Sequence, residues 1–118
     1  MALKLTSRTI DNVKIIDCAG RIVFGDEATQ LREMVKKELG ENNRIVLNLG
    51  DVSYIDSGGL GTLVALYTTA QNGGGAVKLA NLTQWVGDLL QVTKLVTVFE
   101  VYDSEQDAVD SFKKGAAA

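Results

Sequence analysis

The sequence predicts an α/β fold: a mixed, mostly parallel sheet of four to five strands that begins with a hairpin and carries about four α-helices. Segments with strand periodicity alternate with segments of helical periodicity, in the order β β α β α β α β α. Such alternation favours a parallel sheet. The Asp11-Asn12 turn between the first two strands adds an antiparallel pair. A length of 118 residues fits one domain.

Composition limits the classes of function. The chain is 46% hydrophobic and 23% charged, which is typical of a globular protein with a real core. We expect a single domain over residues 1–114 and a flexible C-terminal tail over residues 115–118. The net charge of −3 argues against direct nucleic-acid binding. Polar residues interrupt any signal peptide, and no apolar run of about 18 residues occurs, so we expect a cytoplasmic protein without membrane insertion.

The absence of histidine excludes several kinds of active site. Ser-His-Asp and Cys-His catalysis both need an imidazole, and so do most zinc sites. The single cysteine, Cys18, lies in an apolar strand segment, so we expect it to be a buried small hydrophobe. We therefore predict no catalytic residues, no cofactor and no resident metal.

The first half of the chain contains three strands and one helix. The segments around Leu3–Thr6 and Val13–Ala19 alternate as strands, and Asp26 is expected to cap a helix that ends near Gly40. The nearly continuous apolar run of 44–49 predicts a strand buried on both faces, followed by a loop over 50–56.

The second half contains three helices and two strands. We expect a helix from Ser57 to Gln71 that ends at a glycine run, a short strand, a helix capped by Asn81, a last strand over 96–102 and a final helix after Ser104. Trp85 lies at the edge of an apolar helix stripe. We expect it to be partly buried in the core rather than an exposed anchor for a partner.

The stretch Ile55–Gly61 is the strongest candidate site. Ser57 falls at a predicted helix N-terminus, where unpaired N–H groups and a partial positive charge would stabilise a bound phosphate. Three glycines leave the first helical turn bare, so a kinase or partner can approach the backbone. Because each costs up to about 1 kcal/mol relative to alanine in a helix, they suggest a requirement other than stability.

Other interpretations of this stretch remain open. Ser57 or Asp56 could simply be the helix cap, with the glycines forming a tight turn. The stretch lacks the first glycine of a nucleophile elbow, the third glycine of a dinucleotide fingerprint and a P-loop lysine, so a nucleotide-binding or hydrolytic enzyme is less favoured. A magnesium site built from Asp51 and Asp56 with Asp17 or Asp26 is a further, weaker alternative.

These residues carry a family resemblance. The strand 45–49 followed by Asp51-Val52-Ser53-Tyr54-Ile55-Asp56-Ser57-Gly58-Gly59-Leu60-Gly61 resembles the signature of STAS domains, above all the bacterial anti-sigma factor antagonists. The similarity continues through 74–79 and 89–95 and so covers nearly the whole chain.

The resemblance implies a phosphorylation-controlled binding module rather than an enzyme. Ser57 takes the place of the phosphorylated serine. The unmodified domain would bind an anti-sigma factor that is also a serine kinase, and would thereby free a sigma factor and regulate transcription. A metal-dependent serine phosphatase would reset the switch, and the domain would be a monomer or a weak dimer. The alternative within the family is a subunit of a stress-signalling or lipid-transport complex that Ser57 phosphorylation does not control.

The expected partner surface extends beyond the serine. It comprises seven residues: Phe24, Asp26, Asp56, Ser57, Gly58, Gly59 and Leu60. One segment departs from the family pattern, because Val23 stands where family members often carry an aspartate. Whether Asp26 takes that role is left open by the sequence.

Overall fold

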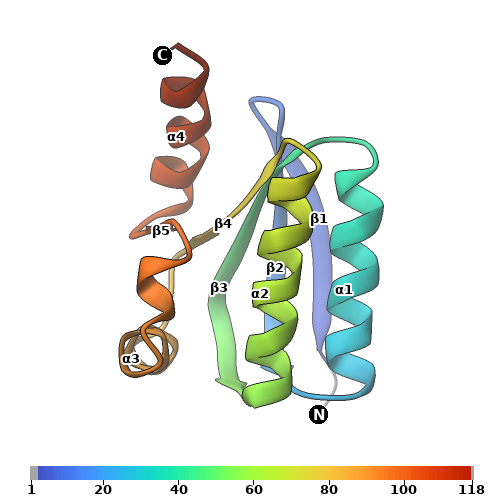
Figure 1. Ribbon diagram of the computed structural model, residues 1–118, viewed down its shortest axis with the longest axis vertical. Helices are drawn as coiled ribbons and strands as arrows, with labels where there is room; N and C mark the ends of the chain where they lie inside the picture. The colour runs from blue at the N-terminus through green and yellow to red at the C-terminus, as the bar shows by residue number, and fades with distance from the viewer. Residues whose placement is uncertain (1–2, 118) are drawn as a thin grey trace.

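The computed structural model describes residues 3–117 and contains one sheet with four α-helices (Figure 1). The elements follow the predicted order, with one short 3₁₀ helix added before the last strand. They are β1 (Lys4–Ile10), β2 (Val13–Ile22), α1 (Asp26–Leu39), β3 (Arg44–Ile55), α2 (Ser57–Asn72), β4 (Ala76–Ala80), α3 (Gln84–Val92), η1 (Leu95–Thr97), β5 (Val101–Tyr102) and α4 (Glu105–Ala117).

The five strands lie side by side in sequence order, β1-β2-β3-β4-β5. The pair β1 and β2 is antiparallel, whereas each later pair is parallel, so the predicted mixed sheet with an opening hairpin is confirmed. The central strand β3 has five fully buried apolar side chains: Ile45, Val46, Leu47, Leu49 and Val52. Because the strands β2 to β4 run parallel, the carboxyl ends of β2 and β3 meet at one edge, where α1 and α2 begin.

Helices cover the two faces of the sheet unequally. The main core lies between the sheet and the helices α1, α2 and α3, and it contains Ile45 and Leu47 of β3. The opposite face has a smaller core, in which Val46 packs with Ala108 and Val109 of α4. Alternate residues of β3 thus serve two cores, which explains why its apolar run is nearly continuous.

Polar contacts also hold α4 on its face of the sheet. Arg8 of β1 forms an ion pair with Asp17 of β2, at 2.7 Å from Nε, and also donates from Nη1 to Glu105 of α4 at 2.9 Å. Glu105 also accepts a bond from Asn48 of β3 at 3.0 Å. Arg8 lowers the pKa of the Glu105 carboxyl, because the guanidinium stabilises its ionised form. Three strands are thereby joined to the last helix.

Several predicted boundaries differ from the structure. The strand expected at 44–49 continues through Ile55, so the expected loop over 50–56 is mostly strand. The helix α1 is capped by Gly25 rather than by Asp26, whose position is the first helical residue. The backbone at Gly25 has φ = +104°, a conformation that L side chains rarely adopt, and this explains the choice of residue.

The C-terminal third shows further differences. The N-cap of α3 is Thr83, whose hydroxyl accepts from the Val86 amide, whereas Asn81 was expected there. The strand predicted over 96–102 is reduced to two residues, because η1 turns the chain and buries Phe99 against Tyr67 instead. The helix α4 extends to Ala117, and position 118 lies outside the described residues. The single domain over 1–114 and the C-terminal tail over 115–118 stay predictions.

Cys18 and Trp85 differ in how well their burial agrees with the sequence prediction. Cys18 is buried, as predicted, and burial raises the pKa of its thiol to about 12. The side chain of Trp85 is 42% exposed, so it is less buried than the position in the core that the sequence predicted. Within the described part of the chain, no helix has the length and apolar character needed to cross a membrane.

Candidate partner-binding site around Ser57

Asp56 organises the edge at which α2 begins. Its side chain accepts a hydrogen bond from the Gly59 amide at 2.8 Å and so caps the helix. Both of its oxygens also lie 3.1 Å from the amide nitrogen of Phe24, in the segment between β2 and α1. These amides, Gly59 first and then Phe24, lower the pKa of the Asp56 carboxyl because they stabilise its charged form.

Ser57 is the first residue of α2, and its side chain is exposed. Its hydroxyl makes no hydrogen bond to any residue that the structure describes. The cap position is taken by Asp56, so the open choice between Asp56 and Ser57 as the cap is settled in favour of Asp56. The Ser57 hydroxyl is therefore available to a reagent at the surface.

Close packing explains two of the three glycines of the motif but not the third. A Cβ atom on Gly59 would lie 1.9 Å from the Ile22 carbonyl oxygen, and one on Gly58 would lie 2.6 Å from the Cβ atom of Phe24. Close packing against β2 and its following loop thus requires both glycines. This corrects the interpretation that all three serve as access for partners. Only Gly61 fits it, because a Cβ atom there would meet nothing within 4 Å.

A groove of about 530 Å³ runs between the first turns of α1 and α2, next to Ser57. Its rim carries Phe24, which is 81% exposed, and Arg32. Small residues of both helices, together with the N-cap residue of α1, form the rest of its lining: Gly25, Ala28, Thr29, Gly58, Gly61, Thr62 and Ala65. The sequence prediction did not include the groove. The recurrence of small residues at helical spacing in 58–65 was the signal that could have revealed it.

The structure brings most of the predicted partner-binding residues together. Phe24 lies against Gly58 and is bonded to Asp56, while Gly59 is buried beneath them. Leu60 is half-buried and packs on the main core, so only part of it can face a partner. Asp26 is exposed at the start of α1, and within residues 3–117 its side chain makes no hydrogen bond or ion pair with the motif. Val23 is half-buried, and its carbonyl accepts the Ala28 amide.

The metal alternative has no geometric support. Asp17 is paired with Arg8, and Asp56 uses its oxygens for the two backbone amides. Over the part of the chain that the structure describes, no three acidic or thiol side chains come close enough to hold a metal ion.

Comparisons with known proteins assign the family. A STAS domain model matches residues 4–108. BtrV of Bordetella bronchiseptica, which is named as an anti-sigma factor antagonist, is 28% identical over 94% of this chain and 96% of its own length. The anti-sigma-B factor antagonist of Bacillus subtilis is 30% identical, with 80% of this chain and 85% of the relative covered.

A solved structure agrees in fold. The crystal structure of a Thermotoga maritima protein named as an anti-sigma factor antagonist has a TM-score of 0.83 and 27% identity, and the match covers 91% of this chain and 92% of that one. The model match, the two relatives and this structure each span most of the sheet and its helices. The chain belongs to the STAS domain family, and its relatives include the anti-sigma factor antagonists.

Proposed function

We propose that this protein is an anti-sigma factor antagonist whose binding is switched by phosphorylation of Ser57. The unmodified domain binds an anti-sigma factor that is a serine kinase, and the bound kinase releases its sigma factor for transcription. The observation that carries the proposal is the free, exposed hydroxyl of Ser57 beside a carboxylate that already caps the helix. The protein acts as a cytoplasmic binding module and has no catalytic residues of its own.

The chemistry of the switch is a phosphoryl transfer. The Ser57 oxygen attacks the γ-phosphorus of ATP held by the kinase, the bond to the β-phosphate oxygen breaks, and ADP leaves while a base of the kinase takes the hydroxyl proton. A metal-dependent serine phosphatase later hydrolyses the phosphoester and restores the hydroxyl.

The phosphate disrupts the complex through charge and desolvation. It adds about 1.5 to 2 negative charges directly beside the ionised Asp56 carboxylate, in a chain whose net charge is already −3. The change from an almost fully bound to an almost fully free population requires a differential affinity of about 5.5 kcal/mol. A dianion at the centre of an interface supplies a good part of this, because it must lose its hydration there.

The test combines mass spectrometry with binding calorimetry. Incubation with the anti-sigma factor kinase and ATP should add one phosphate, on Ser57. The Ser57→Asp variant should bind the kinase at least tenfold more weakly, whereas Ser57→Ala should keep the affinity of the wild type. Ser7→Asp, at an exposed position in the middle of β1, is the matched control. A phosphate on another residue, or equal affinities for all variants, would contradict the proposal.

A further inference from the structure

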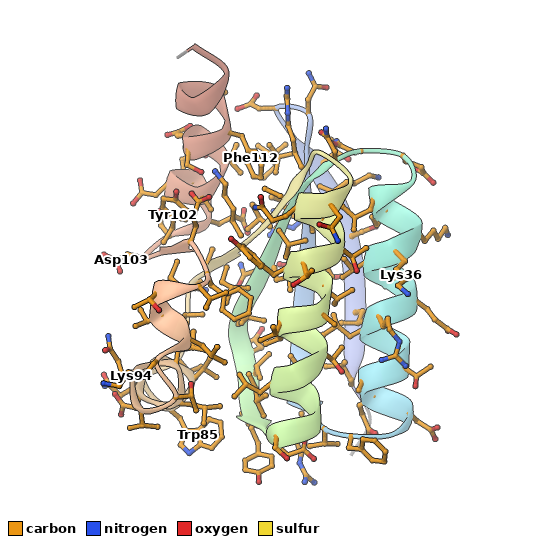
Figure 2. All side chains as sticks on the ribbon, viewed as in Figure 1. Lys36, Trp85, Lys94, Tyr102, Asp103 and Phe112 are labelled. Atoms are coloured by element: carbon orange, nitrogen blue, oxygen red, sulfur yellow. The ribbon has the colours of Figure 1, made fainter. Side chains whose placement is uncertain are left out.

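An exposed aromatic pair lies at the same edge of the molecule as Ser57. Tyr54, near the end of β3, is 41% exposed, and Trp85, in the first turn of α3, is 42% exposed. Their ring centroids are 5.1 Å apart and the rings are tilted by 39°. Figure 2 shows Trp85 at the lower end of the fold, the end at which β3 stops and α2 begins. The two rings contact each other, and both side chains remain partly exposed to solvent.

Arg21 extends this pair on the side of β2. Its guanidinium carbon lies 5.4 Å from the centroid of the Tyr54 ring, and Arg21 and Tyr54 are partners in the β2–β3 register. Its side chain is exposed and has no ion pair or hydrogen bond with any residue in the described range. Besides the Gly59 amide, the charge of Arg21 helps to lower the pKa of the Asp56 carboxyl, but its five donors have no hydrogen-bond acceptor in the described range and can pair with a carboxylate of a partner.

We propose that Arg21, Tyr54 and Trp85, the Arg-Tyr-Trp patch, form a second contact surface for the anti-sigma factor. The anti-sigma factor supplies an apolar side chain that covers the aromatic pair and a carboxylate that pairs with Arg21. The inference rests on the function proposed above. Trp, Tyr and Arg are the residues that most often dominate the free energy of protein binding.

The position of the patch supports this occupant. Tyr54 precedes Ser57 by three residues, and the intervening Asp56 amide bonds to the Ile22 carbonyl at 3.3 Å, next to Arg21. The patch and the serine are therefore built on the same two strand ends, and one partner surface can cover both. A contact on the patch adds to the interface without occupying the site of phosphorylation.

A second copy of the chain is a less suitable occupant. A stable dimer buries about 800 Å² on each partner, and three side chains, two of them more than half covered, supply only part of this area. As an extension of the Ser57 surface, the patch needs no such area of its own. The patch also has a single charged group, Arg21, and contains no carboxylate with which the Arg21 of a second copy could pair.

The experiment measures the affinity of the purified anti-sigma factor kinase for four variants by calorimetry. Trp85→Ala removes the aromatic contact, and Arg21→Gln removes the positive charge without removing buried packing or placing a second carboxylate near Asp56. Both should raise the dissociation constant about tenfold. Lys36→Ala, on the outer side of α1 (Figure 2), is the control and should leave it unchanged. Circular dichroism of each variant confirms that it is folded.

The fourth variant, Ser57→Asp, separates the two proposals. If the wild type binds, Ser57→Asp weakens binding, and both patch variants match the wild type, the patch is overturned while the proposed function stands. If the wild type does not bind the kinase, both fail. Loss of a dimer in Trp85→Ala with unchanged affinity for the kinase would assign the patch to a second copy and overturn the inference.

Discussion

At the scale of single residues, Asp56 couples two segments that lie 32 positions apart in the sequence. It caps α2 through Gly59 and holds the loop before α1 through Phe24. The backbone of Phe24 is thus held by a carboxylate next to the serine. The sequence predicted the cap as one of two choices, but it could not predict the bond to Phe24, because only the parallel pairing of β2 and β3 brings those segments together.

The motif glycines provide a matched pair of substitutions. Gly59→Ala should lower the free energy of unfolding by about 3 kcal/mol, because the added Cβ atom meets the Ile22 carbonyl and the backbones must separate. Gly61→Ala should raise it by about 0.5 to 1 kcal/mol, because alanine favours the helix and its Cβ atom meets nothing. Urea unfolding monitored by Trp85 fluorescence measures both. Similar losses in the two variants would contradict the different roles assigned to these glycines.

At the scale of elements, periodicity predicted most of the fold. The apolar run of 45–49 and the apolar stripes of the helices predicted the observed order of strands and helices. They could do so because the spacing of apolar residues in a sequence follows which faces of an element are buried. The prediction of a strand over 96–102 was wrong. The β-branched residues of this segment fit a strand pattern, but a 3₁₀ turn lets Phe99 pack against Tyr67. The sequence could not predict the exposure of Trp85 either, because its neighbour Tyr54 belongs to another element.

The attachment of α4 should depend on pH through Glu105. Its pKa is lowered in the folded state, so its contribution to stability is full above the unfolded-state value of about 4.5 and is lost as the pH falls through the folded-state value. At pH 7, Glu105→Gln should cost about 1 kcal/mol and should speed amide hydrogen exchange in α4 more than in β3.

The control for this variant is Asp107→Asn, which removes a charge from the same helical turn but has no bond to Arg8. The difference in stability between wild type and Glu105→Gln should shrink towards pH 3. A difference that stays constant from pH 7 to pH 3, or an equal effect of Asp107→Asn, would show that the ion pair does not hold the helix.

At the scale of the whole molecule, the site and the last helix lie at opposite ends. The molecule measures 39 × 27 × 23 Å, and Figure 1 shows the starts of α1 and α2 at one end of the long axis and the end of α4 at the other. A partner bound at the Ser57 edge therefore does not contact the smaller core, which α4 covers. The switch that we propose needs no rearrangement of the sheet.

Phosphorylation should accordingly leave the fold intact. A phosphate at the first residue of α2 lies at the positive end of the helix dipole, so the free energy of unfolding should be unchanged or higher by up to about 1 kcal/mol. Urea unfolding of the modified and unmodified protein measures this, with Ser57→Ala as the control. A loss of more than 1 kcal/mol on phosphorylation would mean that the switch works by unfolding α2.

The sequential order of the strands has a consequence for how the chain is made. Each strand pairs with the one synthesised before it, so a chain that emerges from the ribosome can extend its sheet one strand at a time. The segments that form the Ser57 edge, β2 to α2, are all available once residue 72 has emerged. We therefore expect the Ser57 part of the proposed partner surface to take shape on the nascent chain, whereas Trp85 joins it only after α3 has emerged.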